Sequence, residues 1–437
     1  MARKATMPMV LALLTIALGF AILLLNQEGQ EAVSPPFVYG GAYAGMMLGV
    51  YLIVRLWLPY ADALLIPIVT MLTGVGLITI YRLTFTGSEG SGQLATTQVI
   101  WILVGCAALL LTIFLFRNYQ RLLNYKYLLA FAAFLLIASV STPLGYEVNG
   151  ARLWVSIGPV NFQPSEFARI ALIIFFAGYL AEKREVLAAT SGSFLGIPLP
   201  PLKHFGPVIA VWAASLGLLV FEKDLGSSLL FFLVPLLMLY IATGRIAYLI
   251  LGGMFLSVGS VVSYFLFGHV QVRVIAWLDP WSRANTEGYQ ILQSIFAISE
   301  GGVAGTGLGN GLAGRIPEVE TDFIFSAIAS ELGMLGATAL LLAFLVFVYR
   351  GLKIALYAPD DGSKLLAGGL TVMFALQTFI IVAGVTKLIP LTGITLPFVS
   401  YGGSSVVGNF ILTGLLLVIS DRAGRRMALG EEWDDRP

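Results

Sequence analysis

Long apolar segments recur along the whole chain, and they restrict its fold more than any other feature. About 20 apolar residues suffice to cross a bilayer as a helix, and in lipid the backbone must satisfy its hydrogen bonds within the helix. Such segments lie at 8–25, 38–58, 62–81, 97–116, 126–142, 165–182, 206–221, 226–243, 246–267, 323–349, 365–386 and 396–420. The pattern predicts an all-α polytopic membrane protein with about twelve transmembrane helices.

The composition excludes several other classes of protein. The chain is 58% hydrophobic and 11% charged, whereas soluble domains are about 45–50% apolar and about 25% charged. A net charge of +1 does not favour nucleic acid or a strongly charged partner. One cysteine, Cys106, and two distant histidines, His204 and His269, exclude a disulfide framework and a cysteine- or histidine-based zinc site.

Basic residues predict the orientation, because short cytoplasmic loops are enriched in Lys and Arg. Arg3 and Lys4 precede the first apolar segment, which we expect to be retained as a span since no clear signal-peptide cleavage site follows. If Arg3 and Lys4 are cytoplasmic, twelve alternating spans also place the following residues on the cytoplasmic side: Arg55, Arg117, Arg121, Lys183, Arg184, Arg245, Arg350, Lys353, Arg422, Arg425 and Arg426. Both termini are therefore predicted to be cytoplasmic.

One large loop, at about 268–322, then lies outside the membrane. Within it, 289–298 has apolar residues at helical spacing, which predicts a short helix on the membrane surface. The glycine-rich segment 301–311 predicts an irregular loop with close backbone approach.

Polar residues gather at the outer ends of the predicted spans. Glu166 and Arg169 are three residues apart on one helical face, so they either shield each other as an ion pair or line a water-filled cavity. Lys223 and Asp224 lie in the tight turn after 206–221, where charges are hard to explain as a solvated turn. Arg152 lies in the loop before 165–182.

Two further outer clusters complete this picture. Prolines, glycines and hydroxyl side chains follow Lys387 as far as Ser404. They predict a non-helical backbone that is covered by protein or lines a cavity. The N-terminus of the helix that follows is suited to binding an anion. Asp322 begins the span 323–349, and Glu331 is expected on the opposite face, paired with another helix. Outward-facing cations suit a phosphate-bearing ligand, and a carboxylate suits general-base catalysis. Because helices in the bilayer would form the walls of the cavity, we expect the ligand to be partly lipidic.

Four separated blocks carry a resemblance to a known family. They are "WVSIGPVNFQPSEFAR" (154–169), "EKDLGSS" (222–228), "LDPW…GYQILQS…GTGLGNG…IPEVETDFIF…ELG" (278–333) and "PLTGITLPFVSYGGSS" (390–405). Over about 62–420 the chain resembles the SEDS family of peptidoglycan polymerases (RodA, FtsW and SpoVE). That family usually has ten spans, so 1–61 is expected to add two N-terminal helices and 421–437 to form a cytoplasmic tail. The extension and the "EKDLGSS" variant resemble actinobacterial RodA-type members, which favours a role in elongation and cell shape over division.

The resemblance implies a glycosyltransferase of the bacterial inner membrane that uses lipid II on the outer face. Asp322 falls on the family's essential aspartate and is expected to deprotonate the acceptor 4-hydroxyl, which displaces undecaprenyl pyrophosphate with inversion. Glu320 replaces a frequent histidine and is expected to raise the proton affinity of Asp322. Arg169 replaces the family's lysine, with Glu166 orienting it. The expected substrate-binding residues are Glu166, Arg169, Lys223, Asp224, Arg152, Lys387 and Ser404.

The resemblance also implies partners: a class B penicillin-binding protein (a transpeptidase) and membrane lipids. A divalent cation held by Asp224 or Asp322 is chemically reasonable at a pyrophosphate, although the sequence does not require one. The alternatives are a lipid II flippase or other transporter, a division-type member of the same family, and a scaffold for a transpeptidase. A transporter is expected to show an internal repeat with paired broken helices, and the two halves of this chain differ.

Overall fold

The computed structural model describes most of the 437 residues. The described residues are 6–25, 36–84, 93–148, 151–158, 160–188, 192–194, 197–199, 206, 209–214, 217 and 224–429. The longer helices are α1 (Thr6–Leu25), α2 (Pro36–Trp57), α3 (Leu65–Leu83), α4 (Leu94–Leu115), α6 (Lys126–Ser139), α7 (Pro164–Ala188), α9 (Leu225–Thr243), α10 (Ile246–Leu266), α13 (Ile324–Tyr357), α14 (Asp361–Val385) and α15 (Gly403–Leu429). Shorter helical segments are α5 (Gln120–Asn124), α11 (Gly268–Leu278), α12 (Tyr289–Gly301), η3 (Trp281–Arg283) and η4 (Leu312–Arg315).

Ten of the described helices are long and apolar enough to cross a membrane. They are α1, α2, α3, α4, α7, α9, α10, α13, α14 and α15. The predicted span 126–142 corresponds to the shorter apolar helix α6, and half of the predicted span 206–221 lies outside the described residues. The chain is an all-α polytopic membrane protein, and the count of twelve spans stays a prediction.

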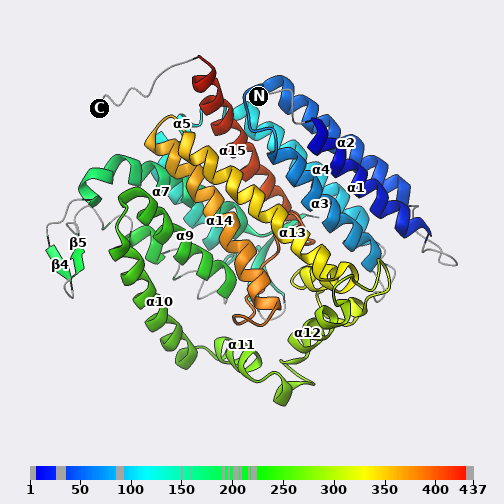
Figure 1. The fold of residues 1–437 in the computed structure, drawn as a ribbon. Helices are drawn as coiled ribbons and strands as arrows, with labels where there is room; N and C mark the ends of the chain where they lie inside the picture. Colours follow the sequence, from blue (N-terminus) through cyan, green and yellow to red (C-terminus); the bar gives the residue numbers. More distant parts are fainter. Residues whose placement is uncertain are drawn as a thin grey trace. The chain divides into compact units, whose positions relative to one another are not determined.

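The chain divides into two compact units. Unit 1 comprises Met1–Phe114, Ile275–Arg350 and Gln377–Pro437, and unit 2 comprises Leu115–Val274 and Gly351–Leu376. In unit 1, α1 packs against both α2 and α3 (Figure 1). The buried Tyr43 hydroxyl of α2 donates to the Thr70 carbonyl of α3 at 2.5 Å. A Cβ on Gly74 of α3 would lie only 2.3 Å from Cδ1 of Ile16 of α1. The N-terminal helix pair is therefore an integral part of unit 1.

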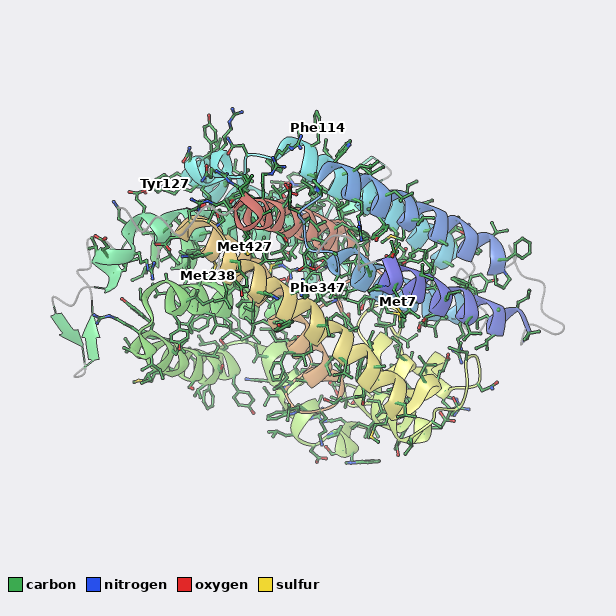
Figure 2. All side chains as sticks on the ribbon, turned by 45° about the horizontal axis from the view of Figure 1, so that its top comes forward. Met7, Phe114, Tyr127, Met238, Phe347 and Met427 are labelled. Atoms are coloured by element: carbon green, nitrogen blue, oxygen red, sulfur yellow. The ribbon has the colours of Figure 1, made fainter. Side chains whose placement is uncertain are left out.

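Large apolar side chains cover the outside of the unit 1 helices. Met7 on α1 and Phe114 on α4 are each 69% exposed (Figure 2). Exposed residues of this kind on spanning helices are the expected contacts with lipid chains.

Unit 2 contains strands that the sequence analysis did not predict. Here α7 packs against α6 and α9. The strands β1 (Gly145–Val148), β2 (Ala151–Ile157) and β3 (Val160–Phe162) form an antiparallel sheet in that order, and β4 (Gly192–Phe194) pairs with β5 (Ile197–Leu199). Strands this short show too little alternation to be recognised. The strand β3 ends two residues before α7, the helix that carries the buried side chains of Glu166 and Arg169.

The segment between α11 and α13 in unit 1 agrees with two predictions. The predicted helix at 289–298 is α12. The glycine-rich segment 301–311 packs against a break in α13 at Gly333, whose φ is 64° and ψ is −168°. A Cβ on Gly305 would lie 2.2 Å from the Glu331 carbonyl oxygen, so the predicted close backbone approach is confirmed.

The non-helical backbone predicted between Lys387 and Ser404 is also confirmed. The chain runs without helix from Pro390 to Leu396, and α15 begins at Gly403 rather than at 396. Phe398 has a φ of +65°, a conformation that a bulky residue rarely adopts. This irregular stretch therefore has a fixed and strained shape.

Candidate active site

The predicted general base, Asp322, lies in a turn directly before α13 in unit 1. The turn is held by the buried side chains of Val319 and Phe323, and the Asp322 amide donates to the Glu318 carbonyl at 3.1 Å. Glu318 is exposed and has a φ of +56°, whereas Glu320 and Asp322 are half-buried. The three acids are close together in the sequence. In the structure, Asp322 lies on a turn that two buried apolar side chains hold in place.

The segment before α15 contacts this turn. The Tyr401 amide donates to the Glu320 carbonyl at 2.8 Å, and the Ser400 hydroxyl donates to the Thr321 carbonyl at 2.5 Å. Burial raises the pKa of the Tyr401 hydroxyl, with a further contribution from the Glu320 carboxylate. The segment before α15 therefore holds the turn through two hydrogen bonds to the turn's backbone carbonyls.

A buried ion pair lies deeper in unit 1. Arg82 of α3 and Glu331 of α13 are 3% and 2% exposed, and Nε of Arg82 lies 2.5 Å from Oε1 of Glu331. Arg82 also donates to the Gly311 carbonyl at 2.8 Å, and the Gly309 amide donates to Glu331 at 3.2 Å. The prediction that Glu331 pairs with another helix is confirmed, although its partner Arg82 was not foreseen. The pair binds the glycine-rich segment to the two helices.

A second polar cluster lies in unit 2. The Glu166 carboxylate and the Arg169 guanidinium form an ion pair, and both side chains are buried. Asp224, also buried, accepts a hydrogen bond from the Ser227 amide at 2.8 Å at the start of α9 and lies within electrostatic range of Glu166. Among the described residues, Oδ2 of Asp224 and the hydroxyls of Ser165 and Ser227 have no hydrogen-bond partner. Since buried polar groups are nearly always paired, this cluster is suited to a polar ligand or ordered water.

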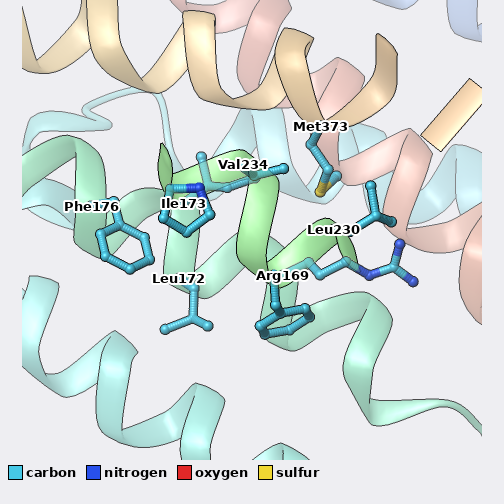
Figure 3. A pocket seen from close by; sticks show the side chains of 9 residues that line it. Arg169, Leu172, Ile173, Phe176, Leu230, Val234 and Met373 are labelled. Atoms are coloured by element: carbon cyan, nitrogen blue, oxygen red, sulfur yellow. The ribbon is translucent and has the colours of Figure 1, made fainter. Parts of the chain in front are cut away.

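Arg169 spans the border between this cluster and an apolar cavity of about 20 Å³ (Figure 3), room for about one water. The cavity is lined by Arg169, Leu172, Ile173, Phe176, Leu230, Phe231, Val234, Pro235 and Met373. In Figure 3 the guanidinium of Arg169 lies at the end of this group away from Phe176. The hydrocarbon stem is thus in apolar surroundings while the charged end pairs with Glu166.

The remaining predicted residues lie elsewhere. Arg152 of β2 is exposed and donates to the carbonyls of Thr142 and Gly145, each at 2.8 Å. In unit 1, Lys387 has a φ of +62° and is half-buried, and Ser404 is buried in the first turn of α15. Lys223 lies outside the described residues. The structure therefore brings Glu166, Arg169 and Asp224 together, and places Asp322, Lys387 and Ser404 in the other unit.

A divalent cation at Asp224 or Asp322 was left open by the sequence. In the part of the chain that the structure describes, no three His, Cys, Asp or Glu side chains lie close enough together to hold an ion. A cation held by Asp224 or Asp322 together with the substrate's pyrophosphate would need only one or two carboxylates, so it stays a prediction.

Comparison with known proteins gives a consistent result. Residues 62–424 match the family model FTSW_RODA_SPOVE, described as "Cell cycle protein". The chain is 41% identical to "Peptidoglycan glycosyltransferase RodA" of Mycobacterium tuberculosis, over 93% of this chain and 88% of that protein. It is 33% identical to "Stage V sporulation protein E" of Bacillus subtilis, over 82% of this chain and 96% of that protein.

Two solved structures are similar as well. One, described as "Structural coordination of polymerization and crosslinking by a peptidoglycan synthase complex", has 26% identity and a TM-score of 0.67, covering 83% of this chain and 98% of that chain. The other is "Rod shape determining protein RodA" of Thermus thermophilus, with 25% identity and a TM-score of 0.57, covering 82% and 96%. The chain therefore belongs to the FtsW/RodA/SpoVE family of cell cycle proteins.

Proposed function

We propose that the chain is a peptidoglycan glycosyltransferase that joins lipid II disaccharides into glycan strands for cell-wall elongation. The observation that carries this proposal is its 41% identity, over 93% of its length, to proteins named peptidoglycan glycosyltransferase RodA. Each unit supplies a group that such a reaction needs: unit 1 contains the half-buried carboxylate of Asp322, and unit 2 contains the buried guanidinium of Arg169 beside unpaired polar atoms.

In the proposed reaction, Asp322 takes the proton from the 4-hydroxyl of the acceptor sugar. The hydroxyl oxygen attacks the anomeric carbon of the donor, the bond from that carbon to the pyrophosphate oxygen breaks, and undecaprenyl pyrophosphate leaves with the electron pair. Inversion follows from this single displacement. A positioned general base typically contributes a factor of about 10²–10⁴ to the rate.

The developing charge on the pyrophosphate needs cations. Arg169 is the first candidate, since it is fixed by Glu166 in a buried site where electrostatic stabilisation is strong. Asp224 holds the N-terminus of α9 beside it. Lys223, Arg152, Lys387 and Ser404 remain the proposed further contacts to substrate.

We place the reaction on the outer face of the inner membrane, in complex with a class B penicillin-binding protein. The outward orientation is supported by the Lys and Arg residues of the predicted inner loops. The partner is supported by the similarity to a structure described as a peptidoglycan synthase complex with polymerization and crosslinking. These two assignments are independent of each other.

The full-length chain, reconstituted in liposomes with labelled lipid II, tests the proposed function. We expect a ladder of glycan strands that is sensitive to a muramidase, with a transpeptidase partner added in a parallel reaction. Transfer of lipid II across the bilayer without any polymer, in both reactions, would instead show a flippase.

The charge of Arg169 provides a sharper prediction. Arg169→Met is expected to lower kcat/KM for lipid II by about 10²–10³, the usual cost of removing one electrostatic contact to a transition state. Arg169→Lys keeps the charge, and lysine is the residue expected here from the family pattern, so it is expected to retain most activity. Equal losses in the two variants, both folded, would contradict a role for the charge.

A further inference from the structure

The backbone immediately before Asp322 is held by a separate segment, Leu396–Tyr401, which we name the anchor segment. We infer that Ser400, together with the Tyr401 amide, is a positioning residue that fixes Asp322 for proton transfer. The inference rests on the proposed function, because it assigns a role relative to the proposed base. All the contacts involved lie within unit 1.

The contacts themselves fix two successive peptide groups. The Tyr401 amide donates to the Glu320 carbonyl at 2.8 Å, and the Ser400 hydroxyl donates to the Thr321 carbonyl at 2.5 Å. The Leu396 amide donates to the same Ser400 oxygen at 2.8 Å. Because the Leu396 amide can only donate, the Ser400 oxygen accepts that hydrogen bond, and the Ser400 hydroxyl proton is directed to the Thr321 carbonyl.

The anchor segment is itself held in place by packing within unit 1. The buried ring of Phe398 packs against Phe347 and Phe410, with ring centroids 6.2 and 5.5 Å apart. The Val399 backbone crosses α3 at Gly76, where an added Cβ would lie 2.3 Å from the Val399 carbonyl oxygen. The positive φ of Phe398 is the kind of strain that persists only where surrounding structure holds it.

These contacts give Ser400 a second role besides packing, which is to position the peptide before Asp322. It is 2% exposed, and its hydroxyl joins the rigid anchor to the peptide that precedes the half-buried Asp322. A base must lie within hydrogen-bond reach of the proton that it removes. A displacement of about 1 Å in a catalytic group can lower a rate by about 10², so losing this bond is expected to affect catalysis before it affects binding.

The test compares Ser400→Ala with Ser326→Ala in the full-length chain. Ser326 is a matched control because it is buried in the same unit and bonds to the Ser294 hydroxyl at 2.7 Å, away from the 320–321 carbonyls. Ser400→Ala is expected to lower kcat for lipid II polymerisation by about 10- to 100-fold with KM changed less than about 3-fold. Ser326→Ala is expected to leave both constants nearly unchanged.

Hydrogen exchange gives a readout that does not depend on activity. In Ser400→Ala, peptides covering 317–325 are expected to exchange faster than in wild type and in Ser326→Ala. Unchanged exchange, an unchanged kcat in a folded Ser400→Ala variant, or an equal loss of kcat in both variants would each overturn the inference. If the wild-type chain does not polymerise lipid II, the proposed function fails, and the exchange rates alone then decide whether Ser400 holds the turn.

Discussion

Replacing Asp322 with Asn is expected to lower lipid II polymerisation by about 10²–10⁴, the contribution typical of a general base. The substitution preserves the size of the side chain and removes its ability to accept a proton. The turn around it is held by Val319, Phe323 and the Asp322 amide, so the fold is expected to remain. The measurement is the initial rate of glycan strand formation in liposomes, together with a melting temperature in detergent.

The same turn supplies the control for this prediction. Glu318 lies four residues earlier and is exposed, so Glu318→Gln removes a negative charge of the segment without touching the proposed base. Its rate is expected to stay close to that of wild type. Full activity in Asp322→Asn would exclude Asp322 as the base, whereas an equal loss in both variants would indicate that the charge of the whole segment attracts the substrate.

The spanning helices were predictable because lipid leaves the backbone few alternatives. Ten predicted segments correspond to helices long enough to cross a membrane, and even the irregular start of α15 was indicated by the prolines and glycines after Lys387. The strands β1 to β3 were not predicted, since β1 and β3 have only four and three residues and the seven residues of β2, ARLWVSI, do not alternate between apolar and polar. Hydropathy thus identifies what must be buried in lipid and says little about short segments outside it.

The candidate site was predictable only in part, for a related reason. The Glu166–Arg169 pair follows from helical spacing, so the ion pair was among the expected arrangements. The link between Ser400 and Thr321 and the pairing of Arg82 with Glu331 join residues far apart in sequence. Local patterns carry no information on such partners, although an ionisable residue within a spanning segment indicated that Glu331 needed one.

The buried Arg82–Glu331 pair is expected to be the most costly single interaction to break in unit 1. Glu331→Ala leaves Arg82 buried beside the glycine-rich segment without this carboxylate, and also removes the acceptor of the Gly309 amide. Removing one partner of a buried ion pair typically costs about 3–5 kcal/mol. We therefore expect a large fall in the melting temperature in detergent and faster hydrogen exchange across 301–311.

A double-mutant cycle separates the pair from simple loss of packing. The cycle comprises Arg82→Met, Glu331→Leu and the variant with both changes. In the double variant, apolar side chains replace both charges, a change that is often neutral for a buried pair, so the combined loss is expected to be smaller than the sum of the two single losses. The exposed pair Arg283–Glu287, separated by 3.6 Å in the segment between α11 and α12, is the matched control, and Glu287→Ala is expected to leave the melting temperature unchanged because exposed pairs contribute little. Additive losses at Arg82 and Glu331 would show that the two side chains act independently, and the glycine-rich segment would then be held by its backbone contacts to α13 alone.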